Sequence, residues 1–227
     1  MAAVPLAQQR TEIAELLGRM CVTVGAALRQ STSALLDDRE RLAAQVEAGN
    51  SAVEELRAKV EQLAITAMAL HAPVAGDLRA VVAAIRCADD IARMGDLAKH
   101  VARTVRRQGG ARIVPDEARA LFAEMGSLGA AMADKAAKVA RDRNVVLALE
   151  LDCDDDAMDQ LLRDVFEMLL APTWTHSVSA AVDVTLLARY YERFADHAVS
   201  VAKQVVYTVT GQTVDQVATE LAMDPEE

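Results

Sequence analysis

The sequence predicts an all-α protein made of two copies of a three-helix bundle, with six long helices in total. Alanine accounts for 45 of the 227 residues, whereas aromatic residues make up 3% and glycine and proline number only 10 and 5. Alanine and leucine lose least on entering a helix, and few helix breakers interrupt them. The apolar residues recur with the 3.6-residue period of amphipathic helices, and the two halves of the chain repeat each other. An all-β domain is excluded.

In the first half we expect helices over residues 5–35, 38–71 and 74–107. The first follows a stripe of apolar residues at helical spacing: Ile13, Leu16, Leu17, Met20 and Val24. Pro73 separates the second helix from the third, because proline cannot continue a helix.

In the second half we expect helices over residues 116–143, 145–170 and 175–209. The first of these carries Leu121, Met125, Leu128 and Met132 at helical spacing. Pro172 separates the last two helices, 99 residues after Pro73.

Gly109-Gly110 is the best candidate for a linker between the halves. We therefore expect a first repeat over residues 1–110, a second over 111–211 and a polar C-terminal tail over 212–227. A shift of 100 residues pairs identical residues in the two halves: Ala80 with Ala180, Val82 with Val182, Arg93 with Arg193, Asp96 with Asp196, Ala98 with Ala198, Val101 with Val201 and Ala102 with Ala202.

The charge balance excludes nucleic acid as a partner. The net charge is −10 and the pI about 4.9, whereas binding of phosphates in DNA or RNA needs a basic surface. The run Arg103-Thr104-Val105-Arg106-Arg107 lies at an expected helix end, where cations complement the helix dipole. This position explains the run without a ligand.

We expect a cytoplasmic protein. No signal sequence is evident, and the longest uncharged stretches, Gln62–Gly76 and Met168–Val182, have fifteen residues each. Each of them contains a proline and is too short to span a bilayer. The three cysteines are scattered without a CxxC motif, as expected for buried small hydrophobic residues in a reducing compartment.

No catalytic motif stands out, and we do not expect an enzyme. Phosphate-binding loops, dinucleotide fingerprints, serine-hydrolase elbows and the His-Glu-x-x-His zinc motif are all missing from the sequence. The four histidines (His71, His100, His176 and His197) do not stand at ligand spacing, and none follows a glutamate by three residues. This also excludes the Glu-x-x-His motif of di-iron bundles.

Two pairs of acids in the second half stand at i,i+4 spacing. Asp155 and Asp159 lie on the fifth expected helix, and Glu192 and Asp196 lie in an apolar run of the sixth. Acids that share one groove repel each other, and a cation would neutralise them. An all-oxygen donor set favours Mg²⁺, Mn²⁺, Ca²⁺ or ferric iron over zinc or copper.

A structural interpretation of these acids stays open. Residues 150–159 hold six acids, so a solvated acidic face would produce such pairs by density alone. Glu192 is also close in sequence to Arg189 and Arg193, and an ion pair could satisfy it.

The first half shows a weaker version of this pattern. Asp89 and Asp96 interrupt an otherwise apolar face of the third expected helix. Arg93 follows Asp89 by four residues, so a structural ion pair and a metal ligand are both open for these acids.

Two segments resemble the hallmarks of PhoU proteins, the cytoplasmic regulators of bacterial phosphate uptake. Ala72-Pro73-Val74-Ala75-Gly76-Asp77-Leu78-Arg79, followed by Asp90-Ile91-Ala92-Arg93-Met94-Gly95-Asp96, is similar to the first hallmark. Tyr191-Glu192-Arg193-Phe194-Ala195-Asp196-His197-Ala198 and the close at Val206-Tyr207-Thr208-Val209-Thr210-Gly211 are similar to the second. The resemblance covers residues 6–211, and Ala181–Leu187 looks most like actinobacterial members.

The resemblance implies a pair of three-helix bundles and a metal site formed by Asp-x-x-x-Asp facing Glu/Asp-x-x-x-Asp in each repeat. The second repeat keeps all four ligands: Asp155, Asp159, Glu192 and Asp196. In the first repeat Asn50 and Glu54 stand where two aspartates are usual, and Ala92 replaces the glutamate. That leaves Glu54 and Asp96, with Asp89 as a substitute one turn earlier, and predicts a weak or lost site.

The resemblance further implies a negative regulator of phosphate uptake and of the phosphate-starvation response. Such a protein would act as an adaptor between the ATP-binding subunit of the phosphate ABC transporter and the phosphate-sensing histidine kinase, reaching the membrane only through these partners. Exposed apolar positions on long helices also favour a homodimer. The alternatives are a carboxylate-bridged metal enzyme and a structural helical adaptor without metal.

Overall fold

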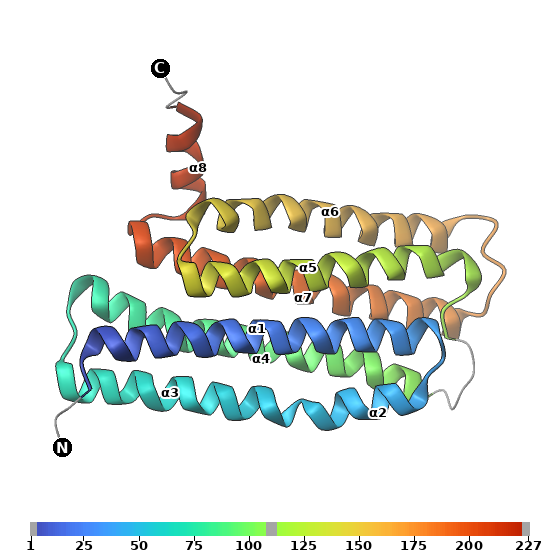
Figure 1. Ribbon diagram of the computed structural model, residues 1–227. Coiled ribbons are helices and arrows are strands. Elements are labelled where there is room, and N and C mark those ends of the chain that lie inside the picture. The colour runs from blue at the N-terminus through green and yellow to red at the C-terminus, as the bar shows by residue number, and fades with distance from the viewer. Residues whose placement is uncertain (1–3, 108–112, 224–227) are drawn as a thin grey trace.

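The computed structural model describes residues 4–107 and 113–223, and in these ranges the chain is helical without strands (Figure 1). The all-α prediction is confirmed. The elements are α1 (Leu6–Leu36), α2 (Glu40–Gly49), α3 (Ser51–His71), α4 (Ala75–Arg107), the short 3-10 helix η1 (Asp116–Ala118), α5 (Arg119–Asp142), α6 (Val145–Leu170), α7 (Val178–Thr210) and α8 (Val214–Met223).

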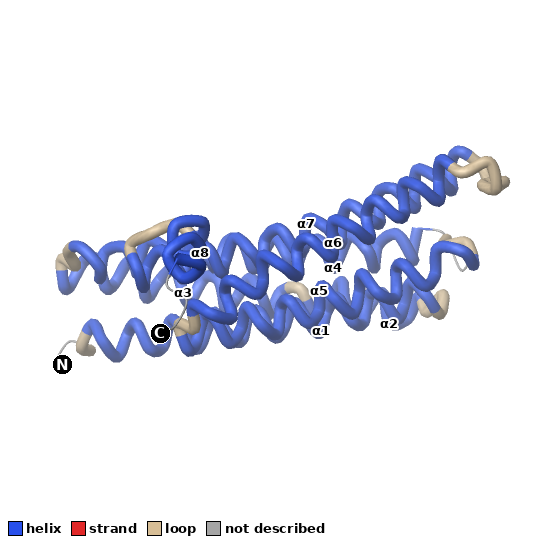
Figure 2. Tube along the Cα trace, turned by 90° about the horizontal axis from the view of Figure 1, so that it is seen from above, coloured by secondary structure: helices blue, strands red, loops and turns tan. Residues whose placement is uncertain are grey.

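The long helices run side by side as an elongated bundle (Figures 1 and 2). α1, α4, α5 and α7 form its centre, with α1 packed on α4 and α5, and α7 packed on α4 and α5. α2 and α3 cover α1 and α4, whereas α6 covers α5 and α7. The largest buried cluster contains residues of all these helices and therefore joins both halves of the chain.

α4 and α7 each have 33 residues and run antiparallel across the centre. Arg107 at the end of α4 forms an ion pair with Asp183 near the start of α7, at 3.0 Å. At the other end, Gly211 after α7 lies beside the Arg79 side chain of α4. Equivalent parts of the two helices therefore lie at opposite ends of the molecule.

Glycines allow α1 and α5 to approach closely. A Cβ at Gly25 would lie 3.1 Å from the Cβ of Ala133, and one at Gly129 would lie 2.8 Å from Leu28 Cδ2. At Gly126 the Thr32 side chain occupies the space that a Cβ would need. Thr32 is held there by a hydrogen bond of 2.9 Å between its hydroxyl and that of buried Tyr191. Thr32 of α1 thus contacts both Gly126 of α5 and Tyr191 of α7.

The expected helix over residues 38–71 is divided into α2 and α3 at Asn50. Glycine and asparagine are weak helix formers, and Gly49-Asn50 places them together. The Asn50 amide donates a hydrogen bond to Asp96 Oδ1 on α4, at 3.2 Å. A Cβ on Gly95 would lie 2.7 Å from Asn50 Oδ1, so this glycine makes room for the contact.

Other boundaries agree closely with the expectation. Ser177 accepts a hydrogen bond from the Ala180 amide and caps α7, which therefore begins three residues later than expected. Gly211 ends α7 in the left-handed conformation, with φ 77°. The expected polar tail contains α8, whose Val214 and Val217 are buried.

Two further expectations meet the structure here. The repeat boundary at residue 110, with its Gly109-Gly110 linker, lies outside the described residues, and the division stays a prediction. Cys21 and Cys87 are buried as expected, but Cys153 is exposed, because it lies on the outer side of α6.

Within residues 4–107 and 113–223, no helix has the length and apolar character needed to cross a membrane.

We predict that Gly126→Ala destabilises the protein. The new methyl group would overlap the Thr32 side chain and disturb its hydrogen bond to Tyr191, at a cost of about 1–3 kcal/mol. Because alanine itself favours the helix by up to ~1 kcal/mol, the melting temperature should fall by roughly 2–6 °C in a thermal unfolding scan. Gly49→Ala is the matched control, since a Cβ there meets nothing within 4 Å. An unchanged melting temperature for Gly126→Ala would contradict the close approach.

Candidate functional site

The four acids of the second half lie along the seam between α6 and α7. Asp155 and Asp159 of α6 are partly buried, Glu192 of α7 is buried and Asp196 is exposed. The charge of Asp196 acts on Asp155 across the seam, and the charge of Asp159 acts on Glu192. The helices therefore turn both acid pairs toward one another.

The environment of this seam raises the pKa values of Asp155 and Glu192. Burial raises the pKa of Asp155 to about 6, and the carboxylates of Asp196 and Asp159 contribute further. Burial also raises the pKa of Glu192, followed by the effect of Asp196, whereas Arg189 opposes the rise. Ionised carboxylates are therefore destabilised here relative to water.

One buried oxygen on each side of the seam lacks a partner. Asp155 Oδ1 and Glu192 Oε2 are buried and accept no hydrogen bond from the described residues. The other Glu192 oxygen accepts a hydrogen bond from Arg189 Nη1 at 2.6 Å. A buried acceptor without a donor costs free energy, so the seam has unused capacity for a positively charged group.

The other acids of residues 150–159 have ordinary surface roles. Lys135 of α5 forms ion pairs with Glu150 and Asp154, at 3.1 and 2.8 Å. Lys203 of α7 lies 3.4 Å from Asp152. Glu150, Asp152 and Asp154 therefore form ion pairs with lysines outside the seam. Asp155 and Asp159 are the acids of this segment that lie at the seam.

The donor chemistry of the seam fits a hard cation such as Mg²⁺, Mn²⁺ or Fe³⁺. As placed, however, no three His, Cys, Asp or Glu side chains of the described residues converge closely enough to hold one. Glu192 is engaged by Arg189 instead. Binding of an ion would require these side chains to move toward one another.

The first-repeat acids have a different environment. Arg57 of α3 forms ion pairs with Glu54 at 2.9 Å and with Asp89 at 3.2 Å. Arg93 lies 4.0 Å from Asp96 and so pairs with that acid rather than with Asp89. These residues line a hollow between α3 and α4. Arginine side chains therefore supply the positive charge beside these acids.

Arg193 differs from Arg93, its equivalent in the first repeat. It is exposed, and it has no ion pair with any residue in the described ranges. Arg189, one turn earlier, is the arginine that engages Glu192.

Sequence reasoning missed a polar contact between α4 and α7. Asp90 accepts a hydrogen bond from Ser200 at 2.7 Å, and its other oxygen lies 2.9 Å from His197 Nδ1. The three side chains are partly buried. The spacing of Ser200 and His197 on one helix face was the available signal, but their partner is more than a hundred residues away.

Comparison with known proteins places the chain among PhoU sequences. The model of the PhoU domain matches residues 17–105 and again residues 122–205. The chain is 45% identical over 204 residues to "Phosphate-specific transport system accessory protein PhoU homolog 2" of Mycobacterium tuberculosis, covering 90% of this chain and 96% of the relative. It is 44% identical over 204 residues to PhoU homolog 1 of Mycobacterium leprae, covering 90% and 92%.

Two crystal structures share the fold. PhoU from Pseudomonas aeruginosa superposes with a TM-score of 0.82 and 22% identity, covering 92% of this chain and all of that one. The phosphate transport system regulatory protein PhoU from Streptococcus pneumoniae gives a TM-score of 0.81 and 20% identity, covering 93% and 100%.

We predict that Asp155→Asn stabilises the metal-free protein at neutral pH. The folded-state pKa of Asp155 is raised from 3.8 to about 6. The protonated carboxyl therefore supports the folded state fully below pH ~4, and this contribution to the free energy of unfolding is lost as the pH rises through 6. After allowance for partial exposure, removal of the charge should gain about 1 kcal/mol at pH 7.5. This corresponds to roughly 2–4 °C in melting temperature.

The measurement is thermal unfolding in a chelating buffer at pH 7.5 and pH 4. Asp156→Asn, at the exposed neighbouring position, serves as the control and should change little. The gain for Asp155→Asn should disappear at pH 4. A gain of equal size at both pH values would contradict the interpretation.

Proposed function

The chain belongs to the PhoU family, and from this premise we propose that it is a cytoplasmic negative regulator of phosphate uptake and of the phosphate-starvation response. It acts as an adaptor between the ATP-binding subunit of the phosphate ABC transporter and the phosphate-sensing histidine kinase. The observation that carries this proposal is the similarity over nine-tenths of the chain to mycobacterial proteins named as accessory proteins of phosphate-specific transport.

The surface of the long central helices supports an adaptor role. Leu78 and Val82 of α4 are exposed one turn apart, as are Val178 and Val182 of α7. A shift of 100 residues relates the two pairs. Exposed apolar side chains that align on one helix face are typical of protein–protein contact sites.

The antiparallel arrangement separates these two pairs. Each pair lies near the start of its helix, and the starts of α4 and α7 lie at opposite ends of the molecule. A rigid bundle with one docking surface at each end can hold two different proteins at a defined separation. We place the transporter subunit and the kinase at these surfaces.

We also propose a metal ion at the α6–α7 seam, held by Asp155, Asp159, Glu192 and Asp196. The unpartnered oxygens of Asp155 and Glu192 and the raised pKa values support it. Bound there, a cation would neutralise the seam and fix α6 against α7. Glu54, Asp89 and Asp96 of the first repeat are weaker candidates, because Arg57 and Arg93 engage them.

Deletion of the gene should derepress phosphate-starvation genes in phosphate-rich medium, measured by transcript levels of the transporter genes. Wild-type chain should restore repression. Leu78→Glu/Val82→Glu and Val178→Glu/Val182→Glu should each fail to do so, because a charge on an apolar docking surface resists burial. Each double variant should also lose one partner in a pull-down from cells grown with phosphate.

Val22→Glu is the matched control, since Val22 of α1 is 44% exposed and lies outside both surfaces. It should restore repression and keep both partners. Exposed substitutions of this kind change stability by only about 0.5 kcal/mol, so thermal unfolding should find all variants folded. Unchanged transcript levels after deletion would refute the regulatory role.

Metal binding is tested by elemental analysis of the purified chain and by thermal unfolding with added Mg²⁺, Mn²⁺ or Fe³⁺. The effective ion should raise the melting temperature of the wild type, by about 5–10 °C when it is present at 100 times its dissociation constant. Glu192→Ala and Asp196→Ala should lower metal content and abolish this rise, whereas Asp156→Ala should not. If metal content and melting temperature stay unchanged in both seam variants, no metal binds there.

A further inference from the structure

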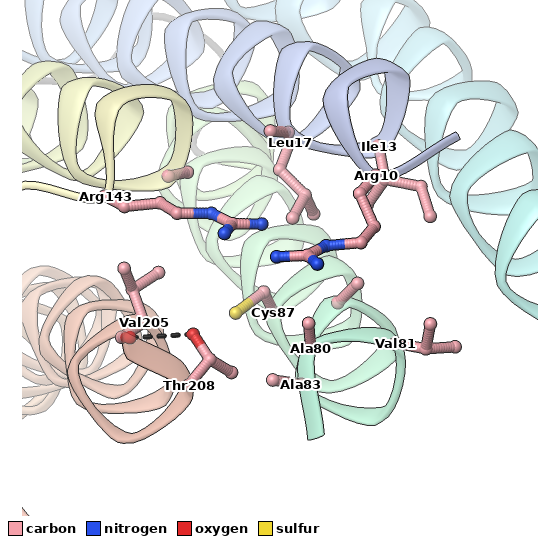
Figure 3. A pocket seen from close by; sticks show the side chains of 13 residues that line it. Arg10, Ile13, Leu17, Ala80, Val81, Ala83, Cys87, Arg143, Val205 and Thr208 are labelled. Carbon is pink, nitrogen blue, oxygen red and sulfur yellow. Dashed lines mark hydrogen bonds between the residues drawn. The ribbon is translucent and has the colours of Figure 1, made fainter. Parts of the chain in front are cut away.

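A pocket opens at the end of the bundle where α1, α4, α5 and α7 meet (Figure 3). Its lining includes Arg10 and Ile13 of α1, Cys87 of α4, Arg143 directly after α5, and Val205 and Thr208 of α7. No residue of the acidic seam contributes to it. The walls are largely apolar, and the two arginines supply the charge.

The guanidinium groups of Arg10 and Arg143 point toward one another across this pocket (Figure 3). Burial lowers the pKa of Arg143, and the positive charge of Arg10 lowers it further, whereas Asp77 opposes the shift. Two cations that face each other in a partly dry pocket repel, and an anion between them would relieve the repulsion.

The described residues around the pocket supply too little negative charge to balance this pair. Asp77 of α4 forms an ion pair with Arg10. Arg143 has no ion pair with any side chain in residues 4–107 and 113–223. In the adjacent hollow Arg141 adds a third cation and Glu15 a second carboxylate, so the side chains named here carry more positive than negative charge.

Arg10 also has an unused hydrogen-bond donor. Its Nε is buried and has no acceptor among the described residues. A guanidinium offers five N–H donors in a planar fork that matches the oxygens of an anion. A ligand with several acceptor oxygens would satisfy this donor together with those of Arg143.

The backbone at Arg143 is unusual for an arginine. It ends α5 in the left-handed conformation with φ 53°, which glycine or asparagine adopts at lower cost. The conformation directs a long cationic side chain into the pocket. Glycine at this position would relax the backbone and remove the charge.

We propose that this pocket binds a small oxyanion of the phosphate type between Arg10 and Arg143. The cavity volume is about 50 Å³, room for roughly four water-sized groups. This space suits the four oxygens of a small tetrahedral anion. The proposal stands on the pocket alone and holds whether or not the acidic seam takes a metal.

The test is calorimetric titration of inorganic phosphate into the full chain at low ionic strength and pH 7.5. The protein is treated with a chelator, so that no metal on the acidic seam can hold the anion. We expect saturable binding at one site, with at least tenfold weaker affinity in Arg143→Gly and an intermediate loss in Arg143→Lys. Sulfate should compete with phosphate, and acetate should compete much less.

Arg86→Ala is the matched control, because it removes one exposed positive charge from α4 outside the pocket. It should bind phosphate as the wild type does. Without phosphate, Arg143→Gly should melt no lower than the wild type, since strain and repulsion are both removed. This separates loss of the ligand site from loss of the fold.

Three results would overturn the proposal. The first is no saturable binding by the wild type below about 10 mM phosphate. The second is equal affinity in the wild type and Arg143→Gly, which would indicate a general salt effect. The third is acetate binding as strong as phosphate binding, which would exclude a site for a tetrahedral anion.

Discussion

The close approach of α1 and α5 joins the two halves of the bundle. Small residues at the crossing allow this approach: Gly126 and Gly129 make room for the side chains of Thr32 and Leu28, and Gly25 lies against Ala133. The approach brings Thr32 of α1 within 2.9 Å of the Tyr191 hydroxyl on α7. The first helices of the two repeats are therefore packed against each other, and α4 and α7 follow on one side.

Two surface features depend on this arrangement. Because α4 and α7 are antiparallel, residues at equivalent positions of the repeats lie at opposite ends of the bundle, which separates the apolar pairs at Leu78 and Val178. The start of α1 and the end of α5 meet at the same end of the bundle as the start of α4, and there Arg10 faces Arg143 and pairs with Asp77. The separation of the two apolar pairs and the facing of Arg10 and Arg143 both require helices from both repeats.

Helix periodicity predicted most of the fold because apolar residues mark the buried face of each long helix. Boundaries moved by a few residues where side chains decide them, as at Ser177, whose hydroxyl caps α7. The division at Asn50 was not predicted, because it accompanies a contact with Asp96, 46 residues away. Contacts between distant segments leave no periodic signal in the sequence.

Contacts between distant segments also limited what the sequence could predict about the acid pairs and the arginines. Spacing of i,i+4 placed each acid pair on one helix face, and the pairs on α6 and α7 do share a seam. Periodicity could not reveal which cation neutralises which acid. Arg57 is three residues from Glu54 but reaches Asp89 on another helix, and Arg10 meets Arg143 across 133 positions of sequence.

The two repeats therefore solve one electrostatic problem in different ways. Each places acids between its second and third helices. The acids of the first repeat are largely exposed, whereas burial makes like charges costly at Asp155 and Glu192 in the second. In the first repeat Arg57 supplies a permanent internal counter-ion to Glu54 and Asp89. In the second repeat Arg189 donates to one oxygen of Glu192, and a buried oxygen of Asp155 has no donor among the residues that the structure describes. The first-repeat acids thus have a counter-ion within the chain, whereas Asp155, with its pKa raised to about 6, changes its charge close to neutral pH.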